Sequence, residues 1–184
     1  MISILFTGDF CPINRVEDVI LMGDFLALSN DFLPIIQSAD LAITNLECPI
    51  TDSQMIISKT GPALKASPRA AEFLNQAGFN LVTLANNHIM DFGLDGLHST
   101  LKVLESNNIS YVGAGNTLRD ANRSFQTKIK GKSIAIINIA ENEFSTTHGD
   151  YPGANPLSLV SNYHTINEAK SNNDFVIVIY HGGN

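Results

Sequence analysis

Short apolar runs alternate with stretches of helical spacing along most of this chain, a pattern typical of an α/β fold. The runs are rich in Ile, Val, Leu and Phe, and Gly, Asn, Asp or Pro bound them, as is usual for buried strands. Strands that are apolar on both faces belong in a sheet covered on both sides, so a largely parallel sheet is expected. The predicted strands span residues 2–7, 40–45, 80–85, 110–112 and 174–180.

Between these strands, apolar residues recur three and four positions apart, which predicts helices. One helix is expected to begin at Pro68, with Ser67 as its N-cap, because Pro suits the first helical position. Gly78 is expected to follow its last turn, where a left-handed residue is needed. The predicted helices cover residues 31–38, 68–77, 94–107 and 159–171.

A predicted β-hairpin makes a mixed sheet possible. Residues 125–129 and 133–139 flank Lys130-Gly131-Lys132, a turn-like sequence between two alternating runs. Residues 49–66 have no clean period and are expected to form a long excursion, of the kind that often lies beside a functional site. No repeat or linker divides the chain, so residues 1–184 are expected to form a single domain of largely parallel or mixed α/β structure.

Composition and charge narrow the possible partners. The chain has 184 residues, of which 44% are hydrophobic and 16% charged, and its formal net charge is −7. Nucleic-acid backbones bind clusters of Lys and Arg, and this sequence has no such cluster. No nucleic-acid partner is therefore expected. No apolar run approaches the ~20 residues of a membrane span and no signal segment begins the chain, so we expect a cytoplasmic protein. Cys11 and Cys48 are then expected to be reduced thiols.

Polar residues that can bind a metal follow several of the predicted strands. In an open parallel sheet the carboxyl ends of the strands share one edge, where ligands bind. We therefore expect these residues to face one cleft although they are far apart in sequence. Carboxylate, amide and imidazole donors together suit Mn, Fe or Zn. The candidates are Asp9, Asn45, Glu47, Asn86, Asn87, His88 and His181.

Each candidate also has a structural interpretation. Asp9 suits a turn or an N-cap, and Glu47 suits a solvated loop. The Asn-Asn-His block can form a capping network at the start of a helix. His88 can donate a proton to a leaving oxygen instead of binding a metal.

Other ionisable residues are less informative. Lys59, in the excursion, can reach an anionic substrate as a point charge, or it can remain solvated at the surface. Asp91 and Asp95 fit the start of the following helix better than a metal site. The remaining histidines lack neighbours that would complete a site; they are His98, His148 and His164.

With these residues in place, the chain resembles the bacterial capsule-synthesis CapA (PGA_cap) family, which is linked to poly-γ-glutamate capsule production. The resemblance covers nearly the whole chain. Its most specific part is Leu84-Ala85-Asn86-Asn87-His88 followed by Asp91-Phe92-Gly93. The other matching segments are Gly8-Asp9, Asn45-Leu46-Glu47, Tyr111-Val112-Gly113-Ala114-Gly115 and His181-x-Gly183.

That family is similar to the calcineurin-like metallophosphoesterases, which implies a layered α/β sandwich around a site for two divalent metal ions. By this resemblance, Asp9 takes the position of the first metal-ligating Asp, and Glu47 lies near the bridging carboxylate. Asn87 matches the ligand Asn and His88 the catalytic His beside it. His181 matches a later metal-ligating His.

The chain departs from the family and superfamily patterns in three ways, one of which is Gly182, where the family has the Trp of His-Trp-Gly. Cys11 stands where the first strand usually has the His of Asp-x-His, and a thiolate would make a softer site for Zn or Fe. A later segment with Gly-His-x-His-like ligands is absent, so we expect an N-terminal portion of a longer domain. The strand 174–180 is expected to be central, yet few residues follow it. An exposed apolar surface or strand edge is therefore predicted, with self-association as a consequence.

Three functions are open from the sequence. The first is capsule or poly-γ-glutamate biosynthesis with a metal-dependent hydrolase core that acts on an anionic small molecule or polymer. The second is a cytoplasmic phosphatase or phosphodiesterase without a capsule role, although members of the resembled family are often membrane-anchored. The third is a non-catalytic binding domain, which Cys11 and the absent later ligands favour.

Overall fold

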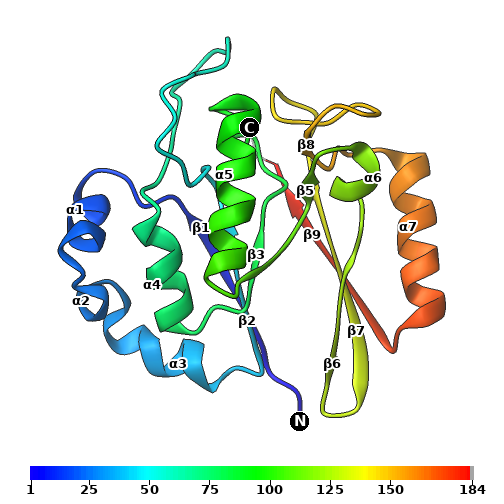
Figure 1. The fold of residues 1–184 in the computed structure, drawn as a ribbon. Helices are drawn as coiled ribbons and strands as arrows, with labels where there is room; N and C mark the ends of the chain where they lie inside the picture. The colour runs from blue at the N-terminus through cyan, green and yellow to red at the C-terminus, as the bar shows by residue number, and fades with distance from the viewer. Residues whose placement is uncertain (183–184) are drawn as a thin grey trace.

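Two β-sheets pack face to face, and helices cover the outer face of each sheet (Figure 1). The computed structural model describes residues 1–182. The first sheet is fully parallel with strand order β1-β2-β3-β4, and the second has the order β6-β7-β9. In the second sheet β6 runs antiparallel to β7, and β9 runs parallel to it. The expected α/β fold is therefore confirmed, with the mixed pairing confined to the second sheet.

The elements follow one another in an order that alternates strands and helices through the first half of the chain. The strands are β1 (Ile4–Phe10), β2 (Leu41–Leu46), β3 (Leu81–Thr83), β4 (Ser110–Val112), β5 (Ala114–Gly115), β6 (Phe125–Ile129), β7 (Lys132–Ala140), β8 (Gly153–Ala154) and β9 (Phe175–His181). The helices are α1 (Arg15–Met22), α2 (Phe25–Ser29), the 3₁₀ helix η1 (Asn30–Phe32), α3 (Leu33–Ser38), α4 (Arg69–Ala77), α5 (Gly93–Ser106), α6 (Leu118–Ala121) and α7 (Leu159–Asn172).

The strands of the first sheet are apolar on both faces because both faces are covered. Every residue of β2 is buried, and its side chains divide between two cores. Ala42 and Leu46 pack with Leu74 and other helical residues, whereas Leu41 and Ile43 pack against the second sheet. Burial on both sides explains why β2 has a continuous apolar run and not an alternating one.

The helix ends follow the local chemistry of the sequence. Gly78 ends α4 in the left-handed conformation at φ 100°, where it donates its N–H to the carbonyls of Leu74 and Asn75. Thr117 and Ser158 cap α6 and α7 with their side-chain oxygens. The expected boundaries of α4, α5 and α7 are thus confirmed to within about two residues, the usual uncertainty of helix ends.

The strand predictions need corrections at both ends of the chain. β1 continues past residue 7 to Phe10, because β2 goes on pairing with it after a register shift between Phe6 and Asp9. Asp9 therefore lies in the strand and does not follow it. The short elements α1, α2, α6, β5 and β8 were not predicted, since few residues fix each of them.

The expectation that the last strand is central is wrong for the described part of the chain. Within residues 1–182, β9 pairs only with β7 and forms an edge of the second sheet. Its exposed apolar side chains include Phe175, Val178 and Tyr180, which are 43–53% exposed. An exposed apolar strand edge was predicted and is observed; self-association stays a prediction. Gly183, from the expected His-Gly-Gly segment, lies outside the described residues.

The long excursion of residues 49–66 has almost no regular structure, as predicted. An isolated bridge between Ile50 and Ala66 closes its base, and the loop rises beside α5 (Figure 1). None of the helices in the described part of the chain combines the length and the apolar character that a bilayer crossing requires.

Candidate functional site

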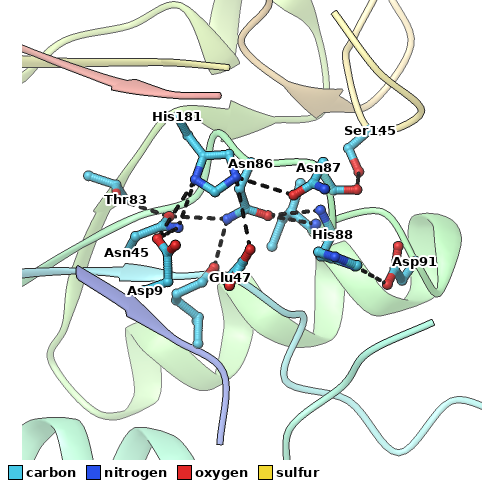
Figure 2. A network of polar contacts seen from close by, with 12 residues as sticks. Asp9, Asn45, Glu47, Thr83, Asn86, Asn87, His88, Asp91, Ser145 and His181 are labelled. Carbon is cyan, nitrogen blue, oxygen red and sulfur yellow. Dashed lines mark hydrogen bonds and ion pairs between the residues drawn. The ribbon is translucent and has the colours of Figure 1, made fainter. Parts of the chain in front are cut away.

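Polar side chains from both sheets meet where β1, β2, β3 and β9 end (Figure 2). Asn45 of β2 donates its Nδ2–H to Asp9 Oδ1 at 2.7 Å and lies 3.2 Å from His181 Nδ1. The other ring nitrogen of His181 lies 3.2 Å from Asn87 Oδ1, just beyond β3. The expected convergence of these strand ends on one cluster is therefore observed.

Two carboxylates share this cluster with a single imidazole. His181 Nδ1 is 3.8 Å from Asp9 Oδ1, and His181 Nε2 is 4.0 Å from Glu47 Oε1. Burial and the neighbouring charge of Asp9 raise the pKa of the Glu47 carboxyl. Among residues 1–182, neither carboxylate has a Lys or Arg partner. The cluster thus concentrates negative charge that a bound cation would neutralise.

A second layer of hydrogen bonds holds these side chains in place. Asn45 Oδ1 accepts from Thr83 Oγ1 and from Asn86 Nδ2, each at 3.2 Å. Asn86 also donates to the carbonyl of Leu46 at 2.8 Å, and its Oδ1 accepts the backbone N–H groups of His88 and Ile89. The fully buried Asn86 amide thus shapes the turn after β3 and has no group left to bind a metal. Asn45 lines the site as an orienting residue.

His88 belongs to a second polar group beside the first one. Its Nδ1 lies 2.7 Å from Asp91 Oδ2, and Lys59 Nζ lies 3.2 Å from the same nitrogen. Lys59 also forms an ion pair with Asp91 Oδ1, and Asp91 Oδ2 accepts the Leu64 N–H at 2.7 Å. The Asp91 side chain is fully buried. Asp91 is therefore part of the site, whereas the sequence had suggested only a helix start; its position three residues after His88 is the signal that was available.

The solvated alternative for Lys59 is wrong, because its side chain is 5% exposed and paired with Asp91. A substrate contact by Lys59 stays a prediction. The structure brings Lys59 to the site through the long excursion, whose residue Ile57 also donates a backbone hydrogen bond to the Asp91 carbonyl.

Cys11 lies next to the cluster but pairs with Cys48. A hydrogen bond with Cys48 lowers the pKa of the Cys11 thiol, and the same contact together with burial raises the pKa of Cys48. Both cysteines are free thiols, as expected from the sequence. Cys11, which the sequence offered as a possible metal ligand, thus forms a hydrogen bond with another thiol.

The donor set fits a divalent cation in its chemistry. Asp9 and Glu47 supply oxygens, Asn87 an amide oxygen and His181 a ring nitrogen, which suits borderline metals such as Mn, Fe or Zn. Within residues 1–182, however, no group of three or more His, Cys, Asp and Glu side chains is drawn together as closely as a metal requires. The His181 ring makes amide contacts instead, so binding a cation requires these side chains to rearrange.

Comparison with known proteins agrees with this geometry. The profile described as "Bacterial capsule synthesis protein PGA_cap" matches residues 3–184. The chain belongs to the PGA_cap family. As a PGA_cap chain, it has the layered α/β sandwich that the motifs implied.

Two curated relatives of this PGA_cap chain are named CapA. It is 28% identical over 188 residues to the "PGA biosynthesis protein CapA" of Bacillus subtilis (strain 168), covering 100% of this chain and 49% of the relative. It is 26% identical over 191 residues to the "Capsule biosynthesis protein CapA" of Bacillus anthracis, covering 99% of this chain and 46% of the relative. The chain therefore spans about half the length of these relatives.

Solved structures share the fold of this PGA_cap chain. A hypothetical protein from Thermus thermophilus aligns with a TM-score of 0.54 at 20% identity, over 100% of this chain and 59% of that protein. A crystal structure described as a novel phosphatase from Mycoplasma pneumoniae also aligns with a TM-score of 0.54 at 20% identity, over 100% and 56% of the two chains. At this level of identity the likeness concerns the fold, which is phosphatase-like.

Proposed function

We propose that this PGA_cap chain carries a metal-dependent hydrolase site and acts in capsule or poly-γ-glutamate biosynthesis. The observation that supports this best is the pair of carboxylates, Asp9 and Glu47, which faces one imidazole without any Lys or Arg partner in residues 1–182. The substrate we propose is anionic, either a phosphoester or the polymer in the names of the relatives. The phosphatase-like fold favours hydrolysis as the type of reaction.

Asp9, Glu47, Asn87 and His181 are the residues that would hold the cation, and two ions are proposed from the metallophosphoesterase-like fold. Divalent ions in such a site polarise the scissile bond and lower the pKa of a bound water. In the protein itself, Asn45 orients Asp9 and His181 through its Nδ2 group. The Asn86 amide fixes the turn that carries Asn87.

His88 is the proposed general acid. Its Nδ1–H donates to Asp91, which leaves Nε2 as the nitrogen that can hold a proton for a leaving oxygen. The buried Asp91 orients the ring and balances its positive charge, while Lys59 neutralises part of the carboxylate. Lys59 can reach an anionic substrate only if its pair with Asp91 opens.

A non-catalytic binding domain is the second candidate. The observation that favours it is the hydrogen-bonded state of His181, whose two ring nitrogens lie near amide groups of Asn45 and Asn87. In this alternative the network itself completes the site, and no metal is required.

Mn²⁺ binding separates the two candidates. We expect the wild-type chain to bind Mn²⁺ in calorimetry, and a concentration of 100 times Kd to raise the free energy of unfolding by about 2.7 kcal/mol. Glu47→Gln removes a charged ligand and should abolish that gain. Asp95→Asn, which neutralises an exposed carboxylate on α5, should leave it unchanged. Wild-type protein that binds no Mn²⁺ and hydrolyses neither an aryl phosphate nor γ-linked polyglutamate would support the binding domain instead.

The pH dependence of stability in the metal-free protein provides a second test of Glu47. Because the pKa of Glu47 is raised on folding, the native state holds the Glu47 proton more tightly than the unfolded state does. Stability without metal should therefore fall as pH rises from 4.5, the ordinary pKa of Glu, through the higher folded value. Glu47→Gln should remove this fall, as measured by urea unfolding across that range.

A further inference from the structure

Asn138 places a polar side chain inside an otherwise apolar interface between the two sheets. It lies in β7 and is 1% exposed. Its side-chain oxygen Oδ1 accepts the backbone N–H of Ala85 at 2.6 Å, and its Nδ2 donates to the carbonyl of Ile179 at 3.3 Å. One carboxamide therefore contacts the segment that follows β3 of the first sheet and also β9 of the second sheet.

Both contacts lie next to residues of the site. Ala85 directly precedes the turn that carries Asn87 and His88. Ile179, the register partner of Asn138 in β9, is two residues before His181. The Asn138 side chain thus lies between the two segments that must meet for Asn87 and His181 to contact each other.

The surrounding backbone leaves room for this carboxamide. Gly113 has φ 100°, and a Cβ at that position would lie 2.1 Å from Asn138 Oδ1 and 2.8 Å from the Ala85 nitrogen. A glycine is therefore required opposite Asn138. Asn155 adds a further bond, since its Nδ2 donates to the Asn138 carbonyl at 2.9 Å.

If only the free energy of folding mattered, a buried amide would be an unfavourable side chain at this position. Burying a polar group costs free energy that its hydrogen bonds only partly recover, whereas an apolar side chain of similar size would simply fill the space. Apolar packing between sheets is not directional, but two hydrogen bonds from one planar group fix a relative position. The amide therefore supplies positional accuracy that the neighbouring isoleucines do not.

We propose that Asn138 is a positioning residue, which sets the relative position of the two sheets so that Asn87 and His181 form one donor set. The proposal rests on the metal site of the proposed function. Residues that orient metal ligands without touching the metal commonly change affinity by about 10–100-fold when replaced. Asn138 acts one step further away, through the backbone that carries the ligands.

The test compares Asn138→Leu with Asn162→Leu by Mn²⁺ calorimetry and urea unfolding. Asn162 is a matched control because it is 5% exposed and accepts a backbone N–H, from Ser158 at the start of α7, away from the site. Both variants should lose stability. Only Asn138→Leu should bind Mn²⁺ about 10–100-fold more weakly, and the Ala85 amide should exchange its hydrogen faster in that variant.

The outcomes distinguish this inference from the proposed function. If the wild-type protein does not bind Mn²⁺, the proposed function is contradicted. The metal site that Asn138 would position is then contradicted as well. If the wild-type protein and the Asn138 variant bind Mn²⁺ with equal affinity, the positioning role alone is overturned. The same holds if both variants bind Mn²⁺ more weakly to an equal degree. Should Asn138→Leu not fold, Asn138→Ser takes its place, because its short side chain cannot span Ala85 and Ile179; the same selective loss is expected.

Discussion

At the scale of single residues, hydrogen bonds fix the orientation of the His88 ring. His88 is held by Asp91 through Nδ1, and Asp91 is in turn bonded to Lys59 and to the Leu64 N–H. The carboxylate is buried and has partners at both oxygens, so it holds the ring in a fixed orientation. This arrangement leaves His88 outside the carboxylate cluster, which supports the acid role proposed for it.

Replacing His88 with Ala should therefore reduce turnover and spare the metal. If the ring protonates a leaving oxygen, kcat should fall by about 10²–10⁴-fold, the range usual for general acid–base catalysis. Mn²⁺ affinity should stay within experimental error, as measured by calorimetry on the same preparation. His98→Ala, on the exposed face of α5, is the control and should change neither quantity. A loss of Mn²⁺ binding in His88→Ala would identify the ring as a ligand and contradict the acid role.

The sequence identifies the strand-end residues more readily than their partners. Asp9, Glu47, Asn87 and His181 follow or end apolar runs, and parallel strands bring such positions to one edge. Asp91 was missed as a site residue because an Asp near the start of a helix already has an ordinary capping role. The only signals for Asp91 in the sequence are its spacing of three residues from His88 and its place in the Asp91-Phe92-Gly93 motif, and the contact with His88 confirms them.

At the scale of elements, an ion pair of the buried Lys59 side chain attaches the long excursion of residues 49–66 to the site. Lys59 pairs with Asp91, and Lys65 donates to Ser53 within the loop at 2.7 Å. The first contact joins the excursion to the turn after β3; the second lies within the loop, and Lys65 Nζ also lies 5.0 Å from the centroid of the Phe92 ring. Ile57 and Leu64 of the excursion add backbone hydrogen bonds to Asp91, and Lys59 adds the ion pair.

Lys59→Met should release the excursion and destabilise the protein. Asp91 would become a buried charge without its cation, which costs about 3–5 kcal/mol. Lys65→Met, which removes one hydrogen bond in the loop and a cation–π contact with Phe92, should cost only about 1–2 kcal/mol. Urea unfolding gives both values, and limited proteolysis should cut residues 49–66 faster in the Lys59 variant alone. Equal losses in the two variants would show that the ion pair does not anchor the loop.

Long periodic elements were predictable, and short or context-dependent ones were not. The helices α4, α5 and α7 and the hairpin of β6 and β7 have clear periodicity and turn residues, so local sequence determines them. The position of β9 in its sheet depends on which strands lie beside it, and an apolar run contains no such information. The division into two sheets likewise came from the family resemblance and not from any local pattern.

For the molecule as a whole, the edge strand β9 is the exposed feature with the clearest physical consequence. Val178 and Tyr180 are 43% and 53% exposed on a strand whose outer edge has no partner in residues 1–182. Unpaired strand edges with apolar side chains favour pairing with another chain. The 184-residue chain is therefore expected to self-associate.

Val178→Lys should weaken that association, because a charged side chain on an edge strand opposes strand addition. Sedimentation velocity over a wide concentration range should show a larger species for the wild-type chain and a monomer for the variant. Leu26→Lys, at a 66% exposed position on α2, is the control and should behave as wild type. A wild-type chain that stays monomeric at all concentrations would contradict the prediction.

The contact between Asn45 and His181 joins residues 136 positions apart, and this separation has a consequence for biosynthesis. At a translation rate of about 5–20 residues per second, about 7–27 s pass between the synthesis of these two residues. For nearly all of that interval Asp9 and Glu47 have already been synthesised, while their imidazole partner does not yet exist. If the site binds a cation as proposed, the complete donor set therefore forms only after His181 has been synthesised, late in the production of this segment.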